Sequence, residues 1–187
     1  MFDFATKFAS GLSYSEFLDR YGSAEQRARW DVIHRKVELT DTQRTLLGNF
    51  TREMKLFVLA GAWCGDCVNQ CPIFDHIAAA SPKIQIRYFD RDADSDLAAA
   101  ISICGGHRVP TVVFLSEDNF FCGIYGDRTL AKYRQMAASQ LGAACPTGIG
   151  APDQTLQQQV VAEWIAEIER VQLMLRLSAR LRQKHGD

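Results

Sequence analysis

The sequence predicts an α/β fold: a mixed central sheet flanked by helices, with an N-terminal helical extension and a long C-terminal helix. Helix-cap signals dominate residues 1–54, and strand-length apolar runs alternate with helical segments over 55–141. Apolar residues then recur every three or four positions over 153–187. A chain of 187 residues has room for one domain with such additions.

The first third is expected to be helical and to pack on the core. It contains three capping boxes, in which a Ser or Thr before a helix is followed three residues later by Glu or Gln. The pairs are Ser13 with Glu16, Ser23 with Gln26, and Thr40 with Gln43. They predict successive helices between residues 12 and 53.

The central segment, 55–141, has the order strand, helix, strand, helix, followed by an antiparallel hairpin after Pro110. Strands are expected at 56–60, 84–89, 111–115 and 120–125, and the hairpin turn at 117–119. Helices are expected at 65–80, from about 94 to 100, and from 127 or 129 to 141.

A connector at 142–152 is predicted because this segment holds three Gly and two Pro. Beyond it, Asp153 is expected to cap one long helix that ends in basic residues, which suit the negative end of the helix dipole. The apolar positions of this helix are Leu156, Val160, Trp164, Ile168, Val171 and Leu175.

The charge balance and the lack of long apolar runs argue against nucleic-acid and membrane partners and against export. Lys and Arg number 21 against 22 Asp and Glu, so no excess positive charge favours nucleic acid. No apolar run is long enough for a signal peptide or a membrane span, which predicts a cytoplasmic protein without a membrane partner. Closely spaced cysteines in that compartment are more often catalytic or metal-binding than structural.

The cysteine pair of Trp63-Cys64-Gly65-Asp66-Cys67 stands at a strand-to-helix junction. Free backbone N–H groups and the helix dipole favour a thiolate there, which would lower the pKa of Cys64 and make it the nucleophile. Cys67, one turn further, can close a disulfide with the same sulfur and is the expected resolving thiol.

The motif and its surroundings resemble the thioredoxin family over roughly half the chain. WCGDC is similar to the family's WCxxC, and Pro72 lies five residues after the second cysteine, as does the proline that kinks the family's active-site helix. The resemblance implies a thioredoxin fold and roles for Trp63, Gly65 and Asp66 within the motif. A closer likeness, to an uncharacterised group of bacterial thioredoxin-like proteins with WCGDC, implies no substrate.

The same resemblance implies a substrate groove. Arg108-Val109-Pro110-Thr111 is similar to the family's cis-proline loop, in which the residue before a cis Pro110 pairs with the substrate backbone. Gly126 resembles the glycine that closes this groove.

The chain departs from the family in two ways that bear on proton transfer. Val58 stands where the family has a buried acid, so His107 is a candidate base for Cys67, alongside the alternative that it is an ordinary surface histidine. Asp66 replaces a proline and opposes a thiolate nearby, which predicts a less acidic Cys64 than in strongly oxidising relatives.

The other four cysteines leave alternatives open. Three interpretations apply to Cys71 and Cys104. They are auxiliary redox thiols, or small buried apolar residues, or, together with Cys64 and Cys67, ligands of a metal ion or an iron–sulfur cluster. Buried packing is the favoured interpretation, and no metal is expected. Cys122 is expected in the core and Cys145 exposed in the connector.

The sequence therefore predicts a thioredoxin-like protein disulfide reductase that needs no cofactor. Its expected partners are a disulfide-containing protein substrate and an unidentified reductant, with a homodimer or partner contact through the C-terminal helix as a further possibility. The alternatives are a thioredoxin-fold binding or adaptor protein and a cysteine-ligated metal or Fe–S protein.

Overall fold

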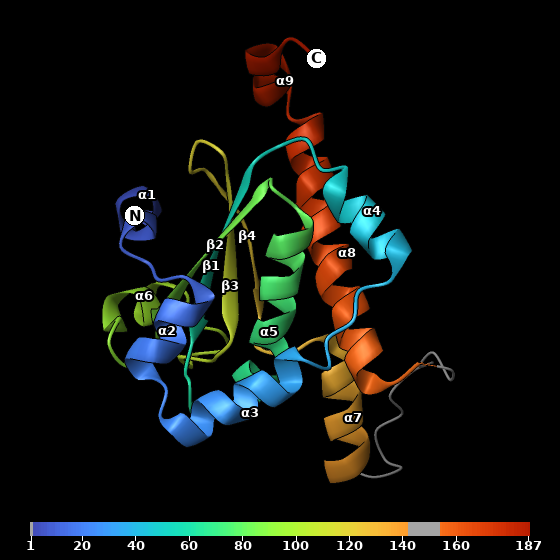
Figure 1. The fold of residues 1–187 in the computed structure, drawn as a ribbon. Helices are drawn as coiled ribbons and strands as arrows, with labels where there is room; N and C mark the ends of the chain where they lie inside the picture. The colour runs from blue at the N-terminus through green and yellow to red at the C-terminus, as the bar shows by residue number, and fades with distance from the viewer. Residues whose placement is uncertain (1, 142–153) are drawn as a thin grey trace.

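The computed structural model describes residues 2–141 and 154–187, and a mixed sheet lies at its centre (Figure 1). The strands are β1 (Met54–Ala60), β2 (Ile84–Asp90), β3 (Thr111–Ser116) and β4 (Phe121–Gly126), in the order β2-β1-β3-β4. β1 pairs parallel with β2 and antiparallel with β3, which pairs antiparallel with β4. The expected α/β thioredoxin architecture is confirmed, although β1 begins at Met54 rather than Leu56.

The N-terminal extension forms the expected helices. All three capping boxes are present, at the starts of α2 (Tyr14–Tyr21), α3 (Ala24–His34) and α4 (Asp41–Gly48). An earlier helix, α1 (Phe4–Ala9), was not predicted. Tertiary packing explains it, because the rings of Phe4 and Phe8 lie 5.5 and 5.1 Å from the ring of Phe57 in β1.

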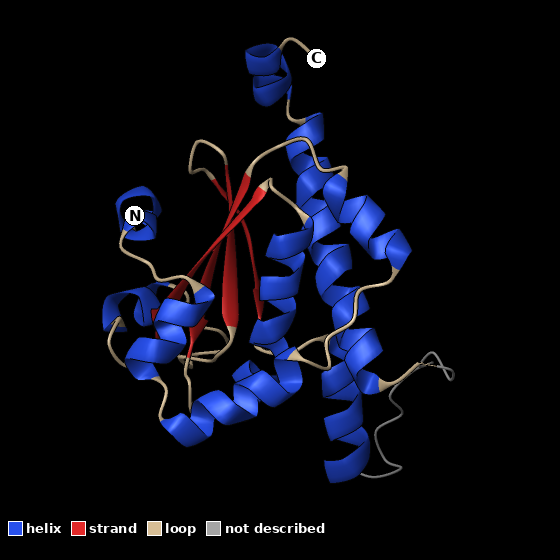
Figure 2. Cartoon of the chain, in the orientation of Figure 1, coloured by secondary structure: helices blue, strands red, loops and turns tan. Residues whose placement is uncertain are grey.

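Helices cover both faces of the sheet (Figure 2). In Figure 1, α1 and α6 (Ser95–Ala100) lie on one side, and α4, α5 (Gly65–Ala80) and α8 (Leu156–Leu177) on the other. On the second side, Trp164 of α8 packs edge-on against Phe74 and Tyr125, with ring centroids 4.5 and 4.9 Å away. The face of α8 that carries Trp164 is therefore part of the core, whereas Leu173, Met174 and Leu177 of the same helix are exposed.

The predicted long C-terminal helix is confirmed as α8, but it ends at Leu177 instead of continuing through the basic residues that follow. The chain has two helices there, α8 and α9 (Ala179–His185), because Ser178 adopts an extended backbone and its side chain caps α9. Serine suits a cap better than a helix interior. Thr155, in a capping box with Gln158, begins α8, whereas Asp153 and the predicted connector lie outside the described residues.

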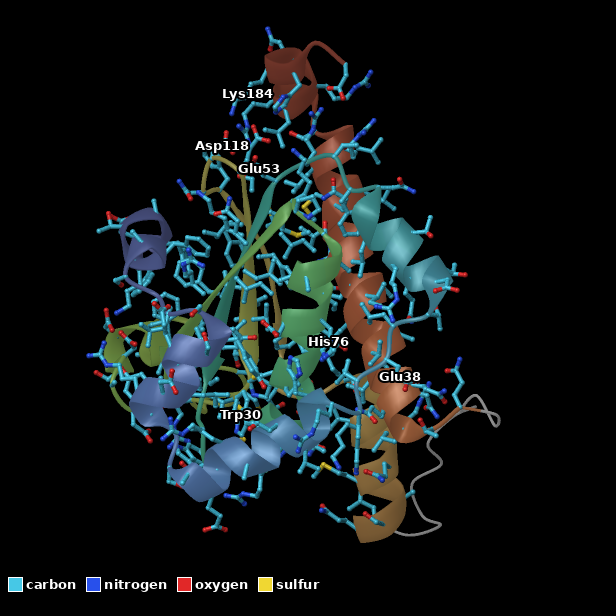
Figure 3. All side chains as sticks on the ribbon, viewed as in Figure 1. Trp30, Glu38, Glu53, His76, Asp118 and Lys184 are labelled. Carbon is cyan, nitrogen blue, oxygen red and sulfur yellow. The ribbon has the colours of Figure 1, made fainter. Side chains whose placement is uncertain are left out.

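The basic end of the chain pairs with the turn between β3 and β4. Lys184 donates to Glu117 at 2.7 Å, His185 lies 2.8 Å from the same carboxylate, and Arg180 pairs with Asp118. Figure 3 shows Lys184 in α9 close to the turn that carries Asp118. These contacts attach α9 to the hairpin.

The last helix of the central segment, α7 (Leu130–Gln140), is capped by Thr129, one of the two expected starts. None of the helices in the described ranges is long and apolar enough to cross a membrane.

Candidate functional site

The cysteine pair lies where β1 gives way to α5. Cys64 is the N-cap of α5, and its backbone N–H donates to the Gly61 carbonyl at 3.0 Å, which closes the intervening turn. Cys64 is half-buried and Cys67 is completely buried, and both are free thiols. The expected nucleophile, Cys64, is thus partly accessible, and the expected resolving thiol, Cys67, lies one helical turn behind it.

The two thiols are coupled. Burial raises the pKa of Cys67 well above its ordinary value. A weak hydrogen bond from the Gly61 N–H to the Cys67 sulfur, at 3.5 Å, lowers this pKa but does not offset the effect of burial. Contact with the Cys67 thiol and partial burial raise the pKa of Cys64, and together they outweigh the N–H groups of Cys67 and Asp66 that lower it. The helix start acts in the expected direction, but the net shift for Cys64 is upward, contrary to the simple expectation.

The proline loop lies against Cys64. The Val109–Pro110 peptide bond is cis, and the Cys64 thiol donates to the Val109 carbonyl at 3.6 Å. The Thr111 hydroxyl donates to the carbonyl of Arg108 at 2.7 Å, which fixes the loop as it enters β3. The structure therefore brings Cys64 and residues 108–111 together.

Gly126 approaches the proline loop so closely that no side chain fits. It is opposite Thr111 in the sheet, and its φ of 149° lies in the region that favours glycine. A Cβ atom there would lie 2.5 Å from the Pro110 carbonyl oxygen. Gly65 differs, because a Cβ there would meet nothing within 4 Å and would point into open space at the motif.

Trp63 supplies an exposed aromatic surface beside Cys64. Its side chain is 44% exposed, and the ring lies so near Gly61 that a Cβ on that glycine would come within 2.7 Å of it. The guanidinium of Arg91 lies 4.4 Å from the ring centroid, a cation–π contact. The indole is thus held in place while remaining accessible.

The candidate base is not brought to the pair. His107 is exposed, and within the described residues it makes no hydrogen bond to either thiol, whereas Cys67 is fully buried. Val58 is also buried, at the position where the family has an acid. The geometry gives His107 no direct path to the proton of Cys67.

Among the remaining cysteines, Cys71 lies next to the pair, because its thiol contacts that of Cys67 and contributes to the raised pKa of Cys67. Cys71 is buried one turn beyond Cys67, as expected for a packing residue. Cys104 is exposed, so the prediction that its side chain is buried is wrong. Cys122 is half-buried rather than in the core because β4 is an edge strand, and Cys145 lies outside the described residues. Within residues 2–141 and 154–187, no group of three or more His, Cys, Asp or Glu side chains could hold a metal ion.

An ion-pair chain beside the motif was missed by the sequence analysis. Arg128 bridges Asp66, at 2.6 Å, and Asp127, at 3.0 Å, and Arg108 reaches Asp127 at 3.3 Å. Tyr133 also donates to Asp127. The sequence placed Asp66 and Arg108 in separate motifs and held no signal that Arg128 joins them.

Two buried tryptophans connect the helical additions to the site. Trp30 of α3 donates to the carbonyl of Ala62, in the turn before Cys64, at 2.9 Å. Trp164 of α8 donates to the Gln70 side chain of α5 at 2.9 Å, and Gln70 donates to the Asp127 carbonyl at 3.0 Å. The sequence analysis identified Trp164 as an apolar position of its helix but gave no indication of these hydrogen bonds.

Comparison with known proteins agrees with this geometry. Residues 11–139 match the family model described as thioredoxin. Over the full fold the chain is similar to a protein of unknown function from Pseudomonas aeruginosa, with 20% identity, 91% of this chain and 99% of that chain covered, and a TM-score of 0.67. It is also similar to an HIV epitope-scaffold, with 20% identity, coverage of 89% and 98%, and a TM-score of 0.65.

No protein with curated annotation matches the sequence. The family match spans well over half of the chain and includes the cysteine pair, the proline loop and Gly126. The chain therefore belongs to the thioredoxin family.

Proposed function

We propose that this protein is a thiol–disulfide oxidoreductase that reduces protein disulfides through a Cys64/Cys67 dithiol cycle. Membership of the thioredoxin family supports a redox function in general. The observation that carries the specific proposal is the half-buried Cys64 thiol at the start of α5, with Cys67 one turn behind it and the Val109 carbonyl 3.6 Å away.

The reaction consists of two exchanges. The Cys64 thiolate attacks one sulfur of the substrate disulfide, a mixed disulfide forms, and the other substrate sulfur leaves as a thiolate. Cys67 then loses its proton and attacks the Cys64 sulfur, which releases the second substrate thiolate and leaves a Cys64–Cys67 disulfide. A separate thiol reductant restores the dithiol, so electrons pass from that reductant to the substrate.

The substrate is proposed to be an extended protein segment that carries a disulfide. It would lie beside Val109, cis Pro110 and Thr111, with the exposed ring of Trp63 as an apolar contact and with Gly126 packed closely against the proline loop. We propose a cytoplasmic reaction because that compartment keeps thiols reduced.

Reduction of insulin tests the proposal. In the presence of dithiothreitol, the purified protein is expected to speed the precipitation of reduced insulin, and its oxidised form should contain a Cys64–Cys67 disulfide by peptide mass mapping. Cys104→Ser serves as the matched control, because that thiol is exposed and outside the pair. If the wild-type protein shows neither insulin reduction nor the disulfide, the proposed function is wrong.

The rate at which the Cys64 thiol reacts with an alkylating reagent should rise with pH. The raised pKa of Cys64 leaves its thiolate scarce near neutrality, so alkylation of Cys64 by iodoacetamide should speed up by almost tenfold per pH unit between about pH 6 and pH 8. A cysteine model peptide with a pKa near 8.5 is the reference and should level off first. A Cys64 rate that levels off at the same pH as the peptide, or at a lower pH, would contradict the upward shift.

A further inference from the structure

The ion-pair chain, defined as Asp66, Arg128, Asp127 and Arg108, has one end in the cysteine motif and the other next to Val109 of the proline loop. Asp66 belongs to the first turn of α5, where its backbone N–H acts on the Cys64 sulfur. Arg108 directly precedes Val109, whose carbonyl accepts from that sulfur. The chain thus joins the cysteine motif to the proline loop through the segment after β4.

Asp127 is the centre of this chain. Its side chain is only 4% exposed and accepts hydrogen bonds from Arg108, Arg128 and Tyr133. Burial alone would raise its pKa, but these donors hold the pKa below the ordinary value, so Asp127 stays ionised. Two carboxylates therefore neutralise two guanidinium groups beside the cysteine pair.

We propose that the ion-pair chain sets the reactivity of Cys64, with Arg128 as the positioning residue that holds Asp66 and balances its charge. This inference rests on the proposed function, because it assigns a role in the same exchange reaction. Asp66 without Arg128 would be an unbalanced negative charge two residues from Cys64, which disfavours the thiolate. Arg128 and Arg108 without Asp127 would be unbalanced positive charges, which favour it.

The other titratable and charged residues near Cys64 are the same in all of the variants that test the role of the ion-pair chain. The Cys67 thiol contacts Cys64 from within α5, Arg91 lies over Trp63 and pairs with Asp92 at 2.8 Å, and His107 is exposed next to Arg108. The two variants compared below leave all of these residues in place, so their effects isolate the charges of the ion-pair chain.

Two substitutions with opposite charge changes give opposite expectations. Arg128→Gln should raise the pKa of Cys64 by about one unit, and Asp127→Asn should lower it by about one unit. A lower pKa yields more thiolate but a weaker nucleophile, so at neutral pH the alkylation rate should fall about threefold in the first variant and rise about threefold in the second. A purely structural role would slow or speed both variants alike.

The measurement is the pH dependence of Cys64 alkylation by iodoacetamide, with Cys64 followed separately from the other thiols by peptide mass mapping. Arg128→Lys keeps the charge and should restore most of the wild-type profile. Arg170→Gln is the matched control, since it removes an arginine whose recorded ion pair is with Glu167 of its own helix, and should leave the profile unchanged.

Opposite shifts for Arg128→Gln and Asp127→Asn, with rescue by lysine, support the proposal. Shifts in the same direction, or none in either variant, overturn it. The alkylation readout does not depend on substrate turnover. If insulin is not reduced by the wild-type protein but the opposite shifts are found, the proposed function fails while control of Cys64 by the ion-pair chain stands.

Discussion

Replacing Cys64 with serine is expected to reduce insulin reduction more than about a hundredfold, because a hydroxyl cannot replace the thiolate as nucleophile in disulfide exchange. The fold should be unaffected, since Cys64 is half-buried and its side chain does not cap α5. Turnover and the melting temperature, measured on the same preparations, separate loss of chemistry from loss of structure.

Cys67→Ser is the matched variant for this experiment. It should also stop turnover, but Cys64 can still attack, so a mixed disulfide with the substrate should accumulate and be visible by mass. Cys64→Ser should trap nothing. If Cys64→Ser keeps full biological activity, the protein acts as a binding or adaptor module rather than through exchange at this thiol.

The largest expected loss of stability follows from Trp164→Ala. The side chain is fully buried between Phe74 and Tyr125, and its indole N–H donates to Gln70. Removal of a large buried aromatic side chain leaves a cavity, which should lower the free energy of unfolding by about 3–5 kcal/mol. Urea denaturation followed by circular dichroism measures this loss.

Trp164→Phe separates the packing of the ring from its hydrogen bond. Phenylalanine retains most of the aromatic contact but leaves the buried amide oxygen of Gln70 without its donor, which should lower the unfolding free energy by about 1–3 kcal/mol. A loss in Trp164→Phe as large as that in Trp164→Ala would show that the hydrogen bond, rather than the packed ring, dominates. A loss below about 1 kcal/mol in Trp164→Ala would contradict the role of the ring in the core.

Features encoded by neighbouring residues could be predicted from the sequence. The capping boxes at Ser13, Ser23 and Thr40 each depend on a side chain three positions later, and all three form. The strands follow from short apolar runs, and the position of Cys64 at the start of a helix follows from the run that ends at Ala60. Local patterns were therefore sufficient for the architecture and for the location of the pair.

Features that depend on distant residues could not be predicted in this way. Trp164 and Gln70 are 94 positions apart, and periodicity identified Trp164 only as apolar. Arg128 pairs with Asp66 only because β3 and β4 bring the segment after Gly126 to the start of α5. The break at Ser178 had a local signal, the preference of serine for caps, but the helical periodicity before it dominated the interpretation.

The hydrogen bonds of Trp30 and Trp164 also bear on whether the thioredoxin-like segment can be separated from the helices that precede and follow it. The extension bonds to the turn before Cys64 through Ala62, and α8 bonds to α5 through Gln70, so both helical additions are attached to the segment that carries the cysteine pair. An excised segment of residues 54–141 would lose both donors and expose the core that α3 and α8 cover. We therefore expect the thioredoxin-like segment and its helical additions to fold as one unit, so that residues 54–141 expressed alone should not fold stably.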